Sequence, residues 1–284
     1  MTRGFTIKIF VPDGSADGLR LVEKSNWSGR GIVCPRADYG VNKKRPDFDS
    51  TGVYILIGPS AESDLPTIYV GEGDPVRPRL DSHNANKDFW TRAIFFISKD
   101  ENLNKAHIQH IESRLIQLAN ELKRCILDNG NSPSRPNLSE MDVAEAEGFL
   151  DELLLCLPIL GVSAFSKPEQ IDRKGQLLYL KGADAVATGY EVSEGFVVVK
   201  ESLARSTTTP SMHSYVGDIR ESLLSRDIFT TKGSQYLLEQ DYTFTSPSQA
   251  AAVMMGRNAN GRIEWKTADG VTLKELQERE VDRE

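Results

Sequence analysis

The sequence predicts an α/β protein: a small central β-sheet flanked by helices, with an N-terminal β extension and a separate α+β domain at the C-terminal end. Three observations predict this class. Runs of β-branched and aromatic residues at 52–57, 67–70 and 93–97 are typical of strands. Between 104 and 127, apolar residues recur at helical spacing. After Phe165 the pattern changes to short strands, turns and short helices.

These patterns divide the 284 residues into four parts. We expect an N-terminal β extension over 1–49, an α/β core over 50–131, a helical connector over 132–164 and an α+β domain over 165–284. Hydrophobic residues make up 39% of the chain, which is enough for two globular parts with cores of their own.

Composition limits the classes of partner. The net charge is −7 and the pI is about 5.3, so contact with a nucleic acid must rest on local basic patches. We find no signal-peptide pattern and no apolar run near the ~20 residues that span a bilayer. We therefore expect a cytoplasmic protein without a membrane span. Cys34, Cys125 and Cys156 lie in apolar contexts, and we expect buried thiols.

The N-terminal extension has the pattern of a small meander. Alternating residues predict strands at 5–9, 19–24 and 31–34. We expect these strands to extend the sheet of the core or to cover one of its edges.

A helix is predicted to follow the second strand of the core. Asp74 followed by Pro75 has the pattern of an N-cap with proline at the first helical position. This helix would carry Arg77, Arg79 and His83. Arg79 and His83 are four residues apart and so share a face.

One residue interrupts the apolar stripe of the long helix. At ~100° per residue, Glu112 falls about 40° from Ile108 on the flank of the stripe, whereas His107, His110 and Arg114 lie away from it. A carboxylate at the border of a packed face needs a partner, either a protein cation or a metal ion. The residues alone favour the salt bridge but leave both alternatives open.

The rest of the chain predicts further helices and strands. Ser139 and Asp142 have the spacing of a capping box, which opens a helix that ends near Leu157. Further along we expect strands at 176–180, 195–199, 242–245 and 262–266, helices at 217–225 and 247–255, and a charged helix at the end.

The two tripeptides Gly52-Val53-Tyr54 and Tyr69-Val70-Gly71 resemble the paired signature of the GIY-YIG nuclease family. Arg79 matches the arginine of the family's first helix, and Glu112 matches the acidic residue of a later helix. The resemblance covers about residues 50–131. It implies a GIY-YIG-like core and a metal-dependent endonuclease that hydrolyses phosphodiester bonds in DNA.

The resemblance also implies roles for individual residues. Tyr54 and Tyr69 would face the scissile phosphate, Arg79 would bind it, and Glu112 would hold Mg²⁺ or Mn²⁺. These roles are chemically coherent, because Mg²⁺ takes few carboxylates and arginine offers a bidentate fork for phosphate. A phenol with a pKa near 10 is a poor base at pH 7, so Tyr54 would need a nearby cation or a metal-bound water.

Further candidates lie around this set. His83 is a proton carrier, a phosphate contact or an ordinary surface residue. The asparagine that completes the family's site would be Asn129 or Asn131. The candidates for DNA contacts are Lys43, Lys44, Arg45 and Arg77. The first three form a basic run that is otherwise a solvated connector.

The C-terminal part resembles a small uncharacterised domain appended to some nucleases of this family, which favours a setting in restriction or phage defence. A polar and aromatic cluster there is either a binding surface or an ordinary structural feature; its members are Arg257, Asn258, Asn260, Arg262, Trp265 and Lys266. Two functions compete with DNA cleavage. One is a protein that keeps the nuclease fold to bind nucleic acid or a partner without cutting, and the other is an enzyme that cleaves RNA.

Overall fold

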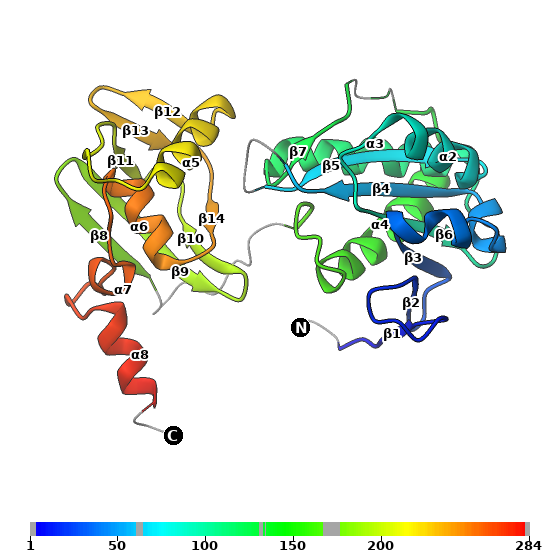
Figure 1. The fold of residues 1–284 in the computed structure, drawn as a ribbon, viewed down its shortest axis with the longest axis horizontal. Helices are drawn as coiled ribbons and strands as arrows, with labels where there is room; N and C mark the ends of the chain where they lie inside the picture. The colour runs from blue at the N-terminus through cyan, green and yellow to red at the C-terminus, as the bar shows by residue number, and fades with distance from the viewer. Residues whose placement is uncertain (1–3, 61–64, 131–132, 134, 167–176, 282–284) are drawn as a thin grey trace. The chain divides into compact units, whose positions relative to one another are not determined.

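The computed structural model describes residues 4–60, 65–130, 133, 135–166 and 177–281, except the side chains of 280 and 281. The chain forms two compact units, Met1–Ser166 and Lys167–Glu284. Each unit has a mixed α/β architecture with a multistranded sheet and a hydrophobic core of its own (Figure 1). Among the described residues, no helix combines the length and the apolar character needed to cross a bilayer.

The described strands of the first unit form a sheet in the order β1-β2-β3-β6-β4-β5-β7. Neighbours are antiparallel except β5 and β7, which are parallel. The N-terminal meander joins the core through the pairing of β3 with β6, so the prediction that it extends the sheet is confirmed. The strands are β1 (Ile7–Phe10), β2 (Arg20–Lys24), β3 (Gly29–Pro35), β4 (Gly52–Gly58), β5 (Thr67–Gly73), β6 (Arg92–Ser98) and β7 (Ile126–Leu127).

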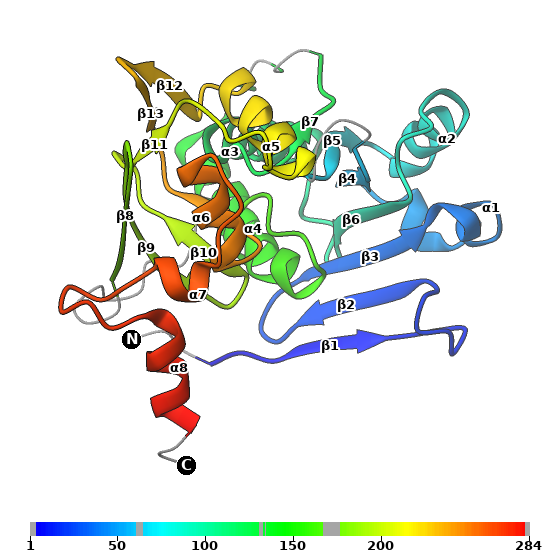
Figure 2. The same cartoon turned by 60° about the vertical axis from the view of Figure 1, so that its left-hand side comes forward.

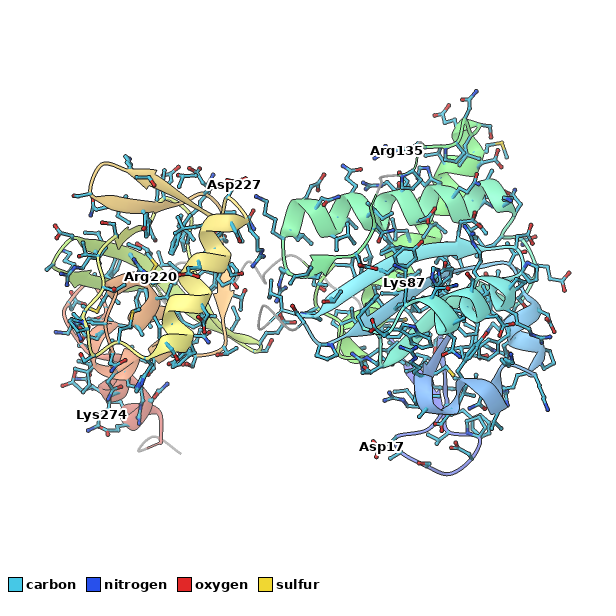
Figure 3. The ribbon with its side chains drawn as sticks, turned by 45° about the horizontal axis from the view of Figure 1, so that its top comes forward. Asp17, Lys87, Arg135, Arg220, Asp227 and Lys274 are labelled. Carbon is cyan, nitrogen blue, oxygen red and sulfur yellow. The ribbon has the colours of Figure 1, made fainter. Side chains whose placement is uncertain are left out.

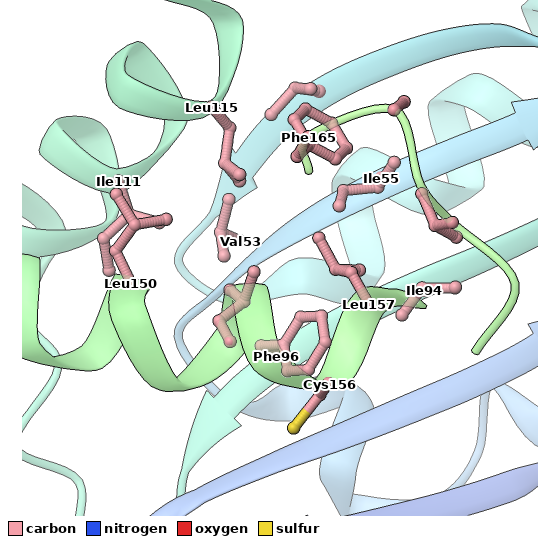
Figure 4. Packing of buried hydrophobic residues seen from close by; sticks show 14 of the residues in the cluster. Val53, Ile55, Ile94, Phe96, Ile111, Leu115, Leu150, Cys156, Leu157 and Phe165 are labelled. Atoms are coloured by element: carbon pink, nitrogen blue, oxygen red, sulfur yellow. The ribbon is translucent and has the colours of Figure 1, made fainter. Parts of the chain in front are cut away.

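Helices cover both faces of this sheet. On one face, α3 (Lys105–Leu122) and α4 (Glu140–Ile159) pack over a core that includes Val53 and Ile55 of β4 (Figure 4). On the other face, α2 (Val76–Asn86) packs with Tyr54 and Leu56 of the same strand. The short elements α1 (Tyr39–Asn42), η1 (Arg36–Asp38) and η2 (Pro46–Asp49) lie between β3 and β4 in the chain. Because both faces are covered, every residue of β4 is buried, which explains its uninterrupted apolar sequence.

The long helix differs from its prediction in length and in packing. It ends at Leu122 because Lys123 adopts a left-handed conformation with φ of 49°, and Ile126 begins β7 instead. His107 and His110, which we expected away from the packed face, are buried, since α3 packs against α4 as well as the sheet. The apolar stripe contacts both the sheet and α4, and His107 and His110 add polar contacts to Asp142 and Glu147 of α4.

The start of α2 also differs from its prediction. Pro75 is the N-cap and makes no side-chain capping bond. The Asp74 carboxylate instead accepts a hydrogen bond from the Thr51 hydroxyl at 2.6 Å. Asp74 therefore joins the helix to the start of β4 rather than capping the helix.

The second unit has its described strands in the order β12-β13-β11-β9-β10-β14, with β8 paired to β9. Helix α6, whose residues 250–255 are buried, packs on one face of this sheet (Figure 2). Arg220 of α5 (Figure 3) is buried and donates to the carbonyls of Val253 and Arg205. The elements are β8 (Leu178–Gly182), β9 (Ala185–Val192), β10 (Gly195–Val198), β11 (Leu203–Arg205), α5 (Ser214–Ser225), β12 (Phe229–Lys232), β13 (Gln235–Leu238), β14 (Tyr242–Phe244), α6 (Pro247–Met255), α7 (Gly261–Glu264) and α8 (Leu273–Val281).

Ser246 caps α6 and Gly256 ends it, as predicted. The prediction of a strand at 262–266 is wrong, because Asn260 caps the short helix α7 through a hydrogen bond to Arg262 N–H. Trp265 after it is fully buried and donates to the Pro247 carbonyl at 2.9 Å, so it belongs to the core. The predicted strand at 176–180 begins at Leu178, and residue 176 lies outside the described residues.

Candidate active site

Tyr54 and His83 form a hydrogen-bonded pair between the sheet and α2. Tyr54 is buried in β4, and its Oη lies 2.8 Å from His83 Nε2. Burial raises the pKa of Tyr54, while burial together with the charges of Lys87 and Arg79 lowers the pKa of His83 to about 4. At neutral pH the phenol therefore stays protonated and donates to an uncharged imidazole.

Gly71 makes room for the Tyr54 ring. The two residues face each other in the register of β4 and β5. A Cβ atom at position 71 would lie 2.3 Å from Tyr54 Oη, which is closer than nonbonded atoms approach. Only glycine at this position leaves the phenol where it meets His83.

Tyr69 lies beside this pair with a cation over its ring. Its ring centroid is 4.8 Å from that of His83 and 6.3 Å from that of Tyr54. The ammonium of Lys87, directly after α2 (Figure 3), lies 4.5 Å from the Tyr69 centroid and pairs with Asp128. This cation–π contact holds a positive charge next to the tyrosines and the imidazole.

Arg79 is exposed on α2, and its Nε donates to the Glu72 carbonyl at 3.3 Å. Among the described residues its guanidinium forms no ion pair. The remaining donors of its fork can therefore bind an anion, as the prediction for Arg79 requires.

Glu112 is half-buried on α3 and has no hydrogen bond or ion pair to any residue that the structure describes. Burial and the nearby charge of Glu72 raise its pKa to about 7, although Arg79 opposes this shift. The charges of Tyr69, Arg79, Glu112 and Glu72 also act on the pKa of Tyr54. These groups therefore lie within electrostatic range of Tyr54, with Glu112 and Glu72 on the α3 side of the sheet and Tyr54 on the α2 side.

This donor set fits a hard divalent cation. Glu112 and Glu72 offer carboxylate oxygens, which are the ligands that Mg²⁺ and Mn²⁺ prefer. A cation between them would relieve the repulsion that raises the pKa of Glu112. The salt bridge that we weighed as the alternative for Glu112 is not found among the described residues.

Asn129 serves the backbone of β5. Its side-chain oxygen accepts from Val70 N–H at 2.9 Å, and its amide nitrogen donates to the Val70 carbonyl at 2.7 Å. The side chain thus fixes the strand that carries Tyr69 and Glu72. Asn131, the other candidate, lies outside the described residues.

Three of the four basic residues predicted to contact DNA are paired with carboxylates. Lys43 pairs with Asp81 at 2.7 Å and Arg77 with Asp49 at 2.6 Å. Arg45 pairs with the buried Asp47 at 3.2 Å, while Lys44 is exposed and forms no ion pair within the described chain. These pairs reduce the local positive charge that the sequence suggests.

The sequence analysis missed Glu72 and Lys87. Alternation along β5 could have found Glu72, because it shares the α3 side of the strand with Ile68 and Val70. Lys87 lies directly after α2 in an extended conformation, so helical spacing from His83 gives no signal for it.

The fold and this cluster define a two-unit α/β protein with a candidate phosphate and metal site in the first unit. A family model described as a domain of unknown function (DUF4357) matches residues 178–277. This match confirms the prediction that the C-terminal part contains an uncharacterised domain. No curated protein and no solved structure matches the chain.

Proposed function

We propose that the protein is a metal-dependent endonuclease that hydrolyses phosphodiester bonds in DNA. The observation that carries this proposal is the half-buried Glu112 carboxylate, which has no partner among the described residues and has Glu72, Arg79 and Tyr54 within electrostatic range. A polar site with an acidic pair, a free arginine fork and a buried phenol has the groups that phosphate hydrolysis requires.

Different residues would bind the metal ion and the phosphate. Glu112 and Glu72 would hold Mg²⁺ or Mn²⁺, which supplies charge neutralisation at a phosphoryl oxygen and a more acidic water. Arg79 binds a non-bridging phosphate oxygen through its free donors. Lys87, fixed over Tyr69, is paired with Asp128 and would contact the anionic substrate by exchanging that carboxylate for a phosphate oxygen.

Tyr54 and His83 handle the proton of the attacking water. The water oxygen bonds to phosphorus as the ester P–O bond breaks, and the leaving alkoxide takes a proton from a solvent water. Because burial raises the pKa of Tyr54, the phenol is a poor base by itself. Its hydrogen bond to His83 provides an acceptor: the Tyr54 oxygen takes a proton from water while its own proton moves to His83 Nε2. The negative phosphate favours the imidazolium that results.

Cleavage of supercoiled plasmid DNA tests the proposal. We expect nicked or linear product with the parent chain in Mg²⁺, none in EDTA, and none from Glu112→Ala or Arg79→Ala. Glu121→Ala is the matched control, since Glu121 is an exposed glutamate on the same helix. No product from the parent chain, or undiminished product from Glu112→Ala and Arg79→Ala, would overturn the proposal.

One observation favours a second candidate, a nucleic-acid-binding or partner-binding protein that does not cut. Asn129, which would complete the nuclease site, has its amide engaged by Val70. A gel-shift assay separates the two functions. The second candidate predicts binding in EDTA and no product when Mg²⁺ is added.

A further inference from the structure

The second unit contains a cavity that the proposed active site does not use. It has a volume of about 470 Å³ and is lined by residues of β8, of α7 and of the chain that follows α7. This volume falls in the range of about 300–1,000 Å³ that is typical of ligand sites. The lining residues that matter here are Tyr179, Lys181, Glu264, Lys266, Thr267 and Gly270.

The two walls of the cavity are tied together by backbone bonds. Tyr179 N–H donates to the Lys266 carbonyl at 2.7 Å, and Lys266 N–H donates to the Tyr179 carbonyl at 3.0 Å. Beyond them, Thr267 N–H donates to the Val271 carbonyl at 2.8 Å. The side chains of Tyr179 and Lys266 are therefore presented from fixed backbone, which reduces the ordering cost of binding a ligand.

The cavity has a positive lining in a chain of net charge −7. Lys181 and Lys266 are exposed and form no ion pair with any residue in the described part of the chain. Glu264 is neutralised by Arg257 at 2.7 Å. Glu275, the acidic group that interacts with Lys266, accepts hydrogen bonds from Thr272. Two ammonium groups are thus available to an anion.

The cavity also offers a ring and a hydroxyl. Tyr179 lies on the exposed side of β8, because Leu178 and Leu180 point into the core, and 37% of its surface is exposed. The Thr267 hydroxyl oxygen accepts from Val271 N–H at 3.1 Å, so its hydrogen can be donated to a ligand. An aromatic face beside cations is the arrangement that binds single-stranded nucleic acid, by base stacking and phosphate contacts.

We propose that this cavity binds a single-stranded segment of DNA, with the phosphates on Lys181 and Lys266 and a base on Tyr179. That the ligand is DNA rests on the proposed function. The cavity adds that this DNA is bound as a single strand. A paired base has no free face for Tyr179, so the cavity selects unpaired nucleotides. Substrates with a single-stranded segment would then be held by the second unit.

Fluorescence anisotropy with a labelled DNA strand of about 12 nucleotides tests the inference. The full-length chain is used in EDTA so that no strand is cut. We expect Tyr179→Ala to weaken binding about 5- to 100-fold and Tyr179→Phe to retain the parent affinity. Lys181→Ala combined with Lys266→Ala should reduce the slope of log affinity against log salt by about 1.4, or about 0.7 for each phosphate contact.

Lys232→Ala is the matched control, because Lys232 is an exposed lysine of the same unit that does not line the cavity. The duplex of the same sequence should bind more weakly and be insensitive to Tyr179→Ala. Parent-like binding by both Tyr179→Ala and the double lysine variant would overturn the inference, as would an equal effect of Lys232→Ala. Plasmid cleavage by the same chain separates the two proposals. If the plasmid is cut but the cavity variants bind the single strand like the parent, only the cavity proposal fails. If the cavity variants lose binding but the parent does not cut the plasmid, only the nuclease proposal fails.

Discussion

Two glutamates that lie beside or on helix α3, Glu147 of α4 and Glu112 of α3, differ in how their charges are balanced. Toward α4, Glu147 accepts from Arg114 Nε at 2.7 Å and lies 2.7 Å from His110 Nε2. Burial opposes the ionisation of Glu147, but these hydrogen bonds outweigh it and lower its pKa. Near β5 and α2, Glu112 has no such partner in the described chain, and its pKa rises to about 7.

The difference separates a structural carboxylate from one that is available to a ligand. The charge of Glu147 is used in holding α3 to α4, so a ligand there would have to displace protein cations. The charge of Glu112 has no ion-pair partner in the described part of the chain, and a half-buried charge of this kind costs stability unless something binds it. Burial alone does not distinguish the two glutamates, but their partners do.

Replacing the carboxylate by an amide in Glu112→Gln and, separately, in Glu147→Gln should give the largest difference between the two glutamates. We expect Glu112→Gln to lower the rate of Mg²⁺-dependent plasmid cleavage by about 10²- to 10³-fold. Glu147→Gln should keep a rate close to that of the parent, since its carboxylate takes no part in the site. Equal losses in the two variants, measured as initial rates, would remove the distinction between the glutamates.

The affinity for Mg²⁺ should depend on pH through Glu112. The carboxylate must lose its proton to bind the ion, and its pKa is about 7. Affinity should therefore rise about tenfold per pH unit from about pH 5 to pH 7 and level off above it. Titration calorimetry measures this dependence, and an affinity that is constant over the same range would contradict the assignment of Glu112.

Stability in EDTA should change in opposite directions in the two amide variants. The folded-state pKa of Glu112 is raised from 4.5 to about 7, so the parent loses stability as the pH rises through this window. Glu112→Gln lacks the charge and should be more stable than the parent by about 2 kcal/mol above pH 7. Urea unfolding at pH 5 and pH 8 measures the difference, which should shrink at the lower pH.

Glu147 gives the reverse dependence because its folded-state pKa is lowered. Its contribution to stability is present at neutral pH and is lost as the pH falls through that lowered pKa. Glu147→Gln should therefore be less stable than the parent at pH 7 by about 1–2 kcal/mol. Urea unfolding at the same pH values measures this change. A Glu147→Gln variant more stable than the parent would show that the hydrogen bonds of Glu147 do not stabilise the contact between α3 and α4.

The smallest expected effect is that of Tyr54→Phe. The variant loses the hydrogen bond to His83 and should lose about 1 kcal/mol of unfolding free energy. Its cleavage rate should fall while Mg²⁺ affinity stays at the parent value, because Tyr54 is not a metal ligand. A parent-like rate would exclude the proton path through His83.

Local patterns predicted the elements of the first unit well where one periodicity dominates. Strands β4, β5 and β6 follow from runs of β-branched and aromatic residues, and the flank position of Glu112 follows from helical spacing. The burial of His107 and His110 does not follow, because the polar contact with α4 carries no apolar signal. The short strand β7 could not be predicted either, because Ile126 happens to fit the helical spacing of the apolar residues before it.

The candidate site was predictable as a set of residues but not as a set of contacts. The order of Tyr54, Tyr69, Arg79 and Glu112 along the chain was visible, whereas the bonds from Asn129 to Val70 join residues far apart in sequence. The ion pair of Lys43 likewise depends on Asp81, a carboxylate that folding brings from a distant part of the chain. In the second unit, the helix at 261–264 depends on the cap from Asn260.

The close fit of Gly71 against Tyr54 restricts which substitutions either position can accept. The tyrosine of one tripeptide occupies the space that the glycine of the other leaves open, so the two motifs are complementary halves of one contact. A side chain introduced at position 71 would have to be accompanied by a smaller residue at position 54. In any set of related chains, these two positions are therefore expected to vary together rather than independently.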